Sequence, residues 1–277
     1  MRAAAVQLQS TTDTEQNLAS AERHTRAAVA DGAELVVLPE RVDIRGGAVD
    51  YRAGAEPLDG RPITWARELA RELGIDLVAG SVAERREGHD RVSNTSVHVG
   101  PDAELRAVYR KIHMFDVEVG GVEYRESEHS EPADELVLSE TANGLRIGLT
   151  VCYDVRFPEL YRILALRGAR IITVPANFTR VTGEAHWEVL LRARAIENQV
   201  FVIAPGQGRR AGPEGDSYGN SMIIDPWGEV LARAPTEGEC HIVAELDLAR
   251  QDDIREKLPS LANRVGAAYR WPQEVRA

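Results

Sequence analysis

Cysteine and lysine are scarce in this chain of 277 residues, and long apolar runs are absent. Two cysteines, Cys152 and Cys240, cannot build a disulfide framework for a chain of this length, so we expect reduced thiols and a cytoplasmic protein. No segment approaches the run of about eighteen apolar residues that a membrane-spanning helix needs. The first residues also lack the apolar stretch of a signal peptide. The sequence therefore predicts neither secretion nor a membrane partner.

An excess of positive charge is missing as well. The formal net charge is −11, which argues against nucleic acid as a partner because phosphate binding requires a basic surface. The seven histidines show no paired-ligand spacing, and the chain has neither a Cys-x-x-Cys pair nor a phosphate-binding glycine loop. We therefore expect no metal and no cofactor.

Among 33 basic residues, only Lys111 and Lys257 are lysines, so arginine supplies nearly all the positive charge. Lys111 lies in the segment Tyr109-Arg-Lys-Ile-His-Met-Phe115. A compact ammonium can donate to an oxyanion where a planar guanidinium would not fit. Lys111 is therefore a candidate catalytic donor, with compositional bias as the alternative explanation.

Cys152 stands where a strand pattern stops and a helical pattern starts. The run Leu145-Arg-Ile-Gly-Leu-Thr-Val151 favours a buried strand, and Pro158 with Glu159 is typical of a first helical turn. A helix amino terminus carries partial positive charge, so we expect it to lower the pKa of Cys152 and favour the nucleophilic thiolate. The alternative is a cysteine that serves only as a small buried apolar residue.

Glu40 closes the run Ala33-Glu-Leu-Val-Val-Leu-Pro-Glu40, as Cys152 follows its own strand. The proline and the apolar neighbours predict a partly desolvated carboxylate. Burial would raise the pKa of Glu40 toward the range useful to a general base. A salt-bridged loop glutamate is the other interpretation.

Helical and strand patterns alternate along the chain, which indicates an α/β fold. Helices are expected over 14–30, 61–73, 158–167, 184–198 and 247–257. Strands are expected over 3–9, 35–38, 75–82, 171–175 and 200–204, with hairpins joining 93–99 to 105–109 and 221–225 to 229–232. Segment 112–132 has little periodicity, so we expect it to be irregular and either functional or mobile. No linker or internal repeat is visible, which favours a single domain over 1–277.

The chain resembles the nitrilase superfamily of carbon–nitrogen hydrolases. The resemblance rests on Leu38-Pro-Glu40, Tyr109-Arg-Lys111 and Val151-Cys-Tyr-Asp154, in that order and at that spacing. Further similar segments are Phe115-Asp116, Tyr124-Arg-Glu-Ser127, Gly183-Glu-Ala-His-Trp-Glu188, Arg192-Ala-Arg-Ala-Ile-Glu-Asn198 and Tyr218-Gly-Asn-Ser-Met-Ile-Ile-Asp-Pro-Trp-Gly228. The Tyr-Asp pair after the cysteine resembles the branch of ω-amidases and deaminated glutathione amidases, whereas true nitrilases usually have Trp-Glu there. This resemblance implies an αββα sandwich of mixed sheets and a homodimer formed through 157–167 and 184–198.

The resemblance also implies roles for individual residues. Cys152 would attack the amide carbon and form a thioester, and Glu40 would carry protons as general base and acid. Lys111 and the backbone N–H of Tyr153 would bind the oxyanion. Glu126 matches a second glutamate that lies near the lysine and helps to orient the substrate.

Other candidates for substrate binding follow the nucleophile or lie in the loop 175–180 and the helix after it. They are Tyr153, Arg156, Asn177, Phe178, Arg180 and His186. Arg156 would either bind a substrate carboxylate or pair with Asp154, and Arg180 is a second carboxylate anchor. Asn177 and Arg180 depart from the family pattern, which leaves the acyl group open.

The expected substrate is a small monoamide of a dicarboxylic acid, such as a 2-oxo acid amide, or deaminated glutathione. An aliphatic amide, a carbamoyl amide or a nitrile is the alternative. A cysteine–histidine hydrolase using His113 or His186 is the rival mechanism, and it would not need Lys111. A scaffold without turnover, or transfer of the acyl group to an amine, would keep the same fold.

Overall fold

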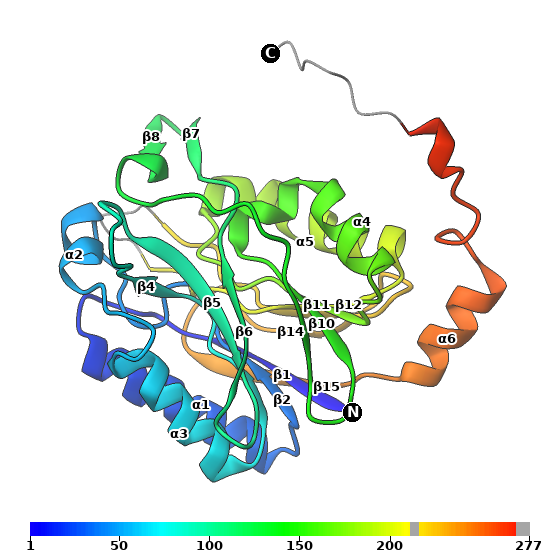
Figure 1. The fold of residues 1–277 in the computed structure, drawn as a ribbon, viewed down its shortest axis with the longest axis horizontal. Coiled ribbons are helices and arrows are strands. Elements are labelled where there is room, and N and C mark those ends of the chain that lie inside the picture. Colours follow the sequence, from blue (N-terminus) through cyan, green and yellow to red (C-terminus); the bar gives the residue numbers. More distant parts are fainter. Residues whose placement is uncertain (211–215, 270–277) are drawn as a thin grey trace.

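Two β-sheets form the centre of the computed structural model, which describes residues 1–210 and 216–269 (Figure 1). In the first sheet β1, β2 and β3 are parallel to one another, and the other pairings are antiparallel. Its strands in order are β15 (Cys240–Glu245), β1 (Arg2–Gln7), β2 (Leu35–Val37), β3 (Asp76–Val78), β5 (Ser93–Val99) and β4 (Val82–Glu84), and β6 (Leu105–Arg110) also pairs with β5.

The second sheet has the same mixed character, with β10, β11 and β12 parallel. Its strands in order are β14 (Val230–Arg233), β13 (Met222–Ile224), β12 (Phe201–Ala204), β11 (Ile171–Thr173), β10 (Arg146–Leu149) and β9 (Leu138–Glu140). Ala5 and Val37 of the first sheet share one buried cluster with Ile147 and Val202 of the second. The two sheets therefore pack face to face around a common apolar core.

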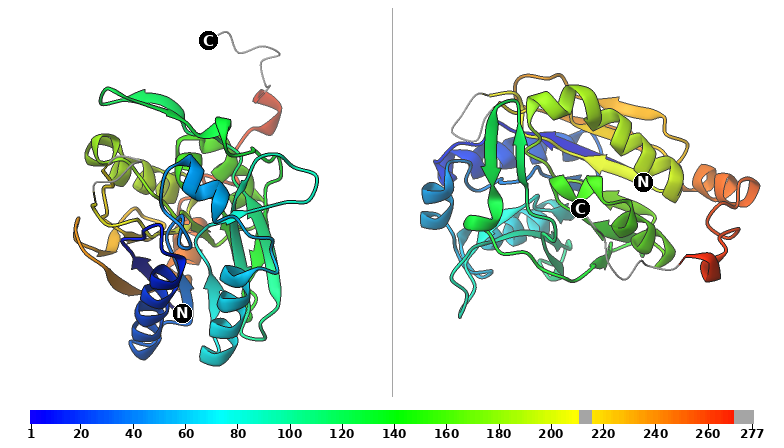
Figure 2. Two further views of the ribbon diagram at one scale, coloured as in Figure 1. Left: turned by 90° about the vertical axis from the view of Figure 1, so that its left-hand side faces the viewer. Right: turned by 90° about the horizontal axis from the view of Figure 1, so that it is seen from above.

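Helices cover the outer face of each sheet (Figures 1 and 2). The first sheet carries α1 (Thr14–Ala30) and α3 (Arg61–Leu73), and the second carries α4 (Pro158–Leu166) and α5 (Arg180–Asn198). Shorter elements are α2 (Ala48–Ala53), α6 (Leu248–Lys257) and the 3-10 helices η1 (Glu126–Glu128), η2 (Cys152–Arg156) and η3 (Gly266–Ala268). The predicted αββα sandwich is confirmed.

Local sequence signals set the ends of α1 and α3. The Asp13 side chain accepts a hydrogen bond from the backbone N–H of Gln16 at 3.1 Å and so caps α1. Pro62 lies in the first turn of α3, and Gly74 ends this helix with a left-handed φ of 66°. Both helices have the bounds predicted from the sequence.

Three predicted segments differ from the structure by more than two residues or in kind. The single strand expected over 75–82 is divided into β3 and β4 by Gly80, whose φ is 60°. A Cβ there would lie 1.9 Å from the carbonyl oxygen of Pro39, so only glycine fits under the loop that leads to Glu40. Helix α5 begins at Arg180 rather than at 184. The segment 112–132 is not irregular throughout, because it contains the hairpin β7 (Asp116–Val119) and β8 (Val122–Arg125) followed by η1.

Each sheet is built around the same βαβαβ unit, a repeat that the sequence does not reveal. The units are β1-α1-β2-α3-β3 and β10-α4-β11-α5-β12. Gly32 follows α1 with φ 90°, and Gly168 follows α4 with φ 99°. A Cβ at either glycine would approach the arginine at the start of the preceding strand, Arg2 at 3.0 Å and Arg146 at 2.9 Å. The likeness therefore extends to corresponding turns, although few residues are the same.

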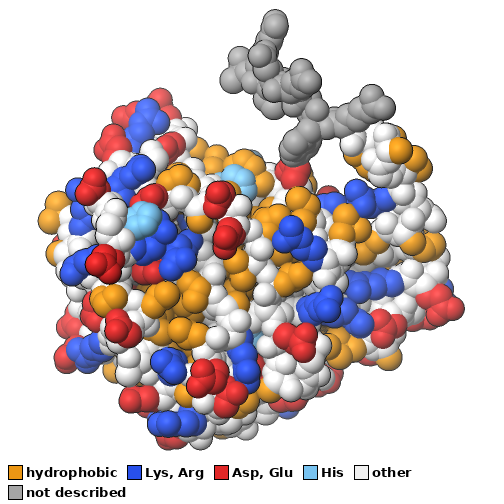
Figure 3. All heavy atoms as spheres, in the orientation of Figure 1, with side chains coloured by type: hydrophobic (Ala, Val, Ile, Leu, Met, Phe, Trp, Pro, Cys, Tyr) orange, Lys and Arg blue, Asp and Glu red, His pale blue; other side chains and the backbone are white. Residues whose placement is uncertain are grey.

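The β7–β8 hairpin stands above the body of the sandwich (Figures 1 and 2). A Cβ on Gly120 at its tip would lie 3.1 Å from Val181, so the hairpin tip contacts α5. On the face shown in Figure 3, side chains of both charge signs are interspersed with apolar ones. None of the described helices combines the length and the apolar character required to cross a bilayer.

Candidate active site

Glu40, Lys111 and Cys152 converge at one end of the sandwich, from strands of both sheets. Glu40 and Cys152 follow the carboxyl ends of β2 and β10, and Lys111 directly follows β6. The carboxyl ends of parallel strands are where α/β folds place their ligand sites. The exposed fractions are 3% for Glu40, 2% for Lys111 and 8% for Cys152, so all three are shielded from bulk water.

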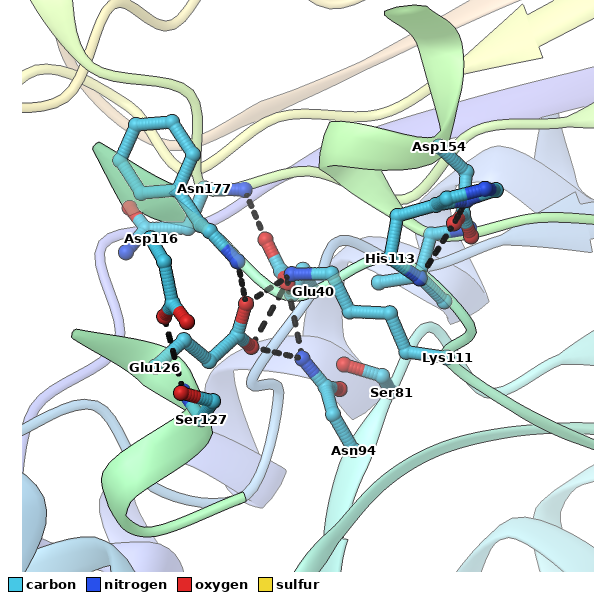
Figure 4. A network of polar contacts seen from close by, with 12 residues as sticks. Glu40, Ser81, Asn94, Lys111, His113, Asp116, Glu126, Ser127, Asp154 and Asn177 are labelled. Atoms are coloured by element: carbon cyan, nitrogen blue, oxygen red, sulfur yellow. Dashed lines mark hydrogen bonds and ion pairs between the residues drawn. The ribbon is translucent and has the colours of Figure 1, made fainter. Parts of the chain in front are cut away.

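A compact hydrogen-bond network fixes the two carboxylates of this site (Figure 4). Lys111 Nζ lies 2.8 Å from Glu126 Oε2 and 3.3 Å from Glu40 Oε1. Glu40 also accepts from Asn94 Nδ2 at 2.8 Å and from the backbone N–H of Asn177 at 2.6 Å. Three donors therefore hold the carboxylate of Glu40, and Lys111 links it to Glu126.

The charges of this network stabilise one another. Burial alone would lower the pKa of Lys111, but the carboxylates of Glu126 and Glu40 outweigh burial and raise it. Burial alone would raise the pKa of Glu126, but Lys111 and Arg41 outweigh it and hold the pKa below its usual value. Lys111 is therefore a cation and Glu126 an anion at neutral pH.

Cys152 occupies a strained position in the turn after its strand. Its φ is 49°, in the left-handed region that residues other than glycine rarely adopt. The backbone N–H of Cys152 donates to the carbonyl of Pro175 at 2.8 Å, and Asp154 Oδ2 accepts from the N–H of Val151 at 2.8 Å. Such strain at the end of a strand is a feature of functional sites, because it directs one side chain out of the sheet.

The predicted lowering of the pKa of Cys152 is wrong. Burial and the negative charge of Glu40 raise this pKa well above its usual value, and Lys111 offsets only part of the effect. Helix α4 begins at Pro158, after the 3-10 helix Cys152–Arg156, so its amino terminus does not lie directly at the thiol. The resting group is a thiol under the influence of the Glu40 carboxylate, and its reaction requires a base.

A cavity of about 320 Å³ opens onto Cys152, and its size suits a small molecule. The sequence-predicted residues that line it are Glu40, Lys111, Glu126, Cys152, Tyr153, Asn177 and Phe178. The β7–β8 region adds Phe115, Val122 and Tyr124 to the wall. The segment 112–132, which has little periodicity in the sequence, therefore contributes to the site through this hairpin.

Arg156, Arg180 and His186 were predicted to bind substrate, but the structure does not place them among the cavity-lining residues. The guanidinium of Arg156 lies 5.3 Å from the ring centroid of Phe178 and 3.3 Å from His186 Nδ1. Arg180 forms ion pairs with Glu184 and Asp216, each at 3.1 Å. Local ring contacts and ion pairs therefore occupy these side chains outside the cavity.

Asp154 does not pair with Arg156, as one interpretation of the sequence expected. Its carboxylate accepts from the hydroxyl of Tyr109 at 2.6 Å and contacts His113 Nδ1 at 2.7 Å. The His113 ring stacks on Phe157 with 3.5 Å between centroids. Neither His113 nor His186 lines the cavity, so the geometry gives no support to a cysteine–histidine mechanism that uses either of them.

Asn94 and Arg41 are among the site residues that were missed in the sequence, as are His129 and the hairpin side chains of the cavity wall. Asn94 donates to Glu40 and lies 3.5 Å from Glu126 Oε1, and all seven residues of its strand, β5, are buried. A buried strand with the polar sequence Ser-Asn-Thr-Ser was the signal that could have revealed it. Arg41 lines the cavity beside Glu40, and no pattern in the sequence marks Arg41 as a site residue. Within residues 1–210 and 216–269, no group of three or more His, Cys, Asp or Glu side chains is arranged to hold a metal ion.

Comparison with known proteins agrees with this geometry. The carbon–nitrogen hydrolase family matches residues 2–256. The deaminated glutathione amidase of Yersinia enterocolitica is 39% identical over 262 residues, which cover 93% of this chain and 91% of that protein. Human omega-amidase NIT2 is 38% identical over 269 residues, which cover 97% of this chain and 96% of that protein.

Solved structures show the same fold. Nit3 of Saccharomyces cerevisiae, a member of branch 10 of the nitrilase superfamily, is 30% identical with a TM-score of 0.87, and the match covers 97% of each chain. The sequence resemblance is thereby confirmed in both family and fold. The protein is an enzyme that acts on amides, and the chain belongs to the carbon–nitrogen hydrolase family.

Proposed function

We propose that this enzyme hydrolyses the terminal amide of a small carboxylate-bearing substrate, in the manner of an ω-amidase or a deaminated glutathione amidase. The observation that carries the proposal is the buried contact of Lys111 with Glu40 and Glu126, in the wall of the cavity that Cys152 also lines. The two amidases compared above support the substrate class.

In the first half-reaction, Glu40 takes the proton of the Cys152 thiol as the sulfur attacks the amide carbon. The raised pKa of Cys152 makes this transfer necessary. The negative oxygen that forms would accept from Lys111 and from the backbone N–H of Tyr153. Glu40 then returns the proton to the departing nitrogen, so that ammonia leaves and a thioester remains on Cys152.

In the second half-reaction, water attacks the thioester carbon while Glu40 accepts its proton. The carbon–sulfur bond breaks, the sulfur regains a proton from Glu40, and the carboxylic acid is released. Glu126 holds Lys111 through contacts of 2.8 and 3.0 Å, so its proposed role is to keep the ammonium aimed into the cavity. One carboxylate thus serves both proton transfers while the other orients the cation.

The test is an ammonia-release assay combined with intact-protein mass spectrometry, using α-ketoglutaramate, deaminated glutathione, a simple aliphatic amide and a nitrile. We expect ammonia from the carboxylate-bearing amides and a transient acyl adduct on the wild type. Cys152→Ala should lose both signals while keeping the thermal unfolding midpoint within a few degrees. Absence of ammonia and of adduct with every substrate would contradict the proposal and favour a scaffold.

We further propose that the enzyme forms a homodimer through α4 and α5. Large apolar side chains are exposed on these helices, with Leu166 at 47%, Val189 at 67% and Ile196 at 47%. Sedimentation equilibrium should give twice the mass of one chain, and the double variant Leu166→Asp/Val189→Asp should shift it to one. A wild type that sediments as a single chain at micromolar concentration would exclude this dimer.

A single domain over 1–277 and a cytoplasmic location are also proposals. One buried cluster that spans both sheets supports the single domain, although residues 211–215 and 270–277 lie outside the described part. The two free cysteines agree with a reducing compartment. Limited proteolysis would test the first, since a stable fragment much shorter than the chain would contradict it, and cell fractionation would test the second.

A further inference from the structure

Arg41 brings a buried positive charge to the wall of the cavity. It directly follows Glu40, has a φ of 59°, and is 7% exposed. Its guanidinium lies 4.5 Å from the ring centroid of Tyr51 and is close enough to Glu126 to help lower the pKa of that carboxyl. The left-handed conformation at Arg41 therefore places a general-base candidate and a cation next to each other on one cavity wall.

His129 lies beside Arg41 on this wall. It lines the cavity, and its ring meets the ring of Tyr51 edge-on, with 6.2 Å between centroids. Its Nε2 is buried, and no hydrogen-bond partner for it occurs among the described residues. Burial and the charge of Arg41 lower the pKa of His129, so a neutral ring is available to donate through Nε2–H.

The other arginines near the site are either exposed or outside the cavity. Arg125 lines the cavity but is half exposed. Arg156 and Arg180 are not among the cavity-lining residues. Arg41 is therefore the buried arginine among the cavity-lining residues of the described chain.

We propose that Arg41 and His129 form a subsite for a carboxylate at the end of the substrate opposite the amide. Arginine binds carboxylates through two parallel hydrogen bonds, and a buried arginine does so with little competition from water. The amide carbon must reach Cys152, so a carboxylate bound by Arg41 and His129 lies at the other end of the substrate. The subsite thus favours a carboxylate-bearing substrate and holds its amide toward Cys152.

The proposal rests on the amidase function above. It is tested by the ratio of kcat/KM for a carboxylate-bearing amide to kcat/KM for a neutral amide. For wild type, Arg41→Gln and Arg41→Lys, kcat/KM is measured with glutaric acid monoamide and with pentanamide, which has the same chain length but no carboxylate. Arg41→Gln should lower the ratio of acid to neutral substrate by about 10- to 100-fold, mostly through KM, because a hydrogen-bonded charge pair is lost. Arg41→Lys should retain part of the wild-type preference for the acid substrate. Arg180→Gln, which changes an arginine outside the cavity, is the matched control and should keep the wild-type ratio.

An equal ratio in folded Arg41→Gln and wild type would overturn the subsite. A wild type that hydrolyses pentanamide as well as the acid would also overturn it and would leave the amidase function standing. A binding measurement on a variant without turnover tests the subsite independently of catalysis. In the Cys152→Ala background, calorimetry should detect the monoamide, and adding Arg41→Gln should weaken its binding by a similar factor. Failure of turnover with retained, Arg41-dependent binding would reject the hydrolase proposal alone.

Discussion

Glu40 and Asp43 lie three positions apart in one loop, and their partners differ in charge. Glu40 is held by an ammonium and two neutral donors. Asp43 is 1% exposed and accepts only neutral backbone N–H groups in its described hydrogen bonds, from Ala83 at 2.9 Å and Ile44 at 2.8 Å. Burial raises the pKa of Asp43 to about 7, and these hydrogen bonds and the charge of Arg41 oppose the change only in part. Glu126, which is also buried but contacts Lys111, has a pKa below its usual value, so the charge of the partner decides how burial affects a carboxyl.

This difference predicts a pH dependence of stability. Between about pH 4 and pH 7 the folded chain keeps a proton on Asp43 that the unfolded chain has released, so this group makes the free energy of unfolding fall as pH rises through that window. The slope has an upper limit of about 1.4 kcal/mol per pH unit. Urea unfolding at pH 5, 6, 7 and 8 should show wild type losing stability relative to Asp43→Asn up to pH 7, then running parallel to it. A difference that is constant from pH 5 to pH 8 would contradict the expectation.

Site residues that were predicted from the sequence differ from those that were missed in the kind of signal that marks them. Glu40, Lys111 and Cys152 each follow a recognisable strand, so their chemistry could be predicted from local pattern. Arg41 and Asn94 matter through contacts with residues far away in the sequence, which no local pattern encodes. The raised pKa of Cys152 was missed for the same reason, because Glu40 and burial determine it rather than the following helix.

At the scale of elements, a contact between a strand and a turn fixes the distance from the cation to the nucleophile. Tyr109 and His113, two residues before and after Lys111, both bind the carboxylate of Asp154, two residues after Cys152. Figure 4 shows the His113–Asp154 contact beside the cluster of Lys111 and the two glutamates. The end of β6 and the turn after β10 are thereby joined through one buried side chain, that of Asp154.

Tyr109→Phe should expose the importance of this contact. It removes a donor from a buried carboxylate, so we expect a loss of about 2 kcal/mol in the free energy of unfolding. We also expect kcat to fall about tenfold with KM nearly unchanged, because Lys111 is less well aimed. Tyr161→Phe is the control: its buried hydroxyl lies 2.9 Å from the neutral Thr150 hydroxyl, and the change should cost about 1 kcal/mol with little effect on kcat. Equal stability losses and equal kcat values in the two variants would reject this role for Asp154.

At the scale of the whole molecule, the layers were predictable and their internal repeat was not. Alternating helix and strand patterns are encoded in apolar spacing, which is why the bounds of α1 and α3 agree with expectation. The likeness of the two βαβαβ units is carried by backbone turns such as those at Gly32 and Gly168, where different sequences satisfy the same geometry. The break at Gly80 in a predicted strand was missed because it depends on the close approach of Gly80 to Pro39, which is distant in the sequence.

Each sheet supplies only part of the chemistry. Glu40 and Lys111 follow strands of the first sheet, whereas Cys152 and Asn177 follow strands of the second. A functional site therefore exists only while the two sheets are packed together. Loss of activity on heating or in denaturant should follow separation of the layers rather than fraying of an outer helix.

The scarcity of lysine gives this arrangement a practical consequence. Lys111 has a side chain that is 2% exposed between the layers, whereas Lys257 on α6 is 74% exposed. An amine-reactive reagent would thus find one lysine side chain on the folded protein, besides the terminal amine, and would reach the second only after the sandwich opens. Counting the labels on each molecule would then report directly whether the two halves of the site are still assembled, without any substrate.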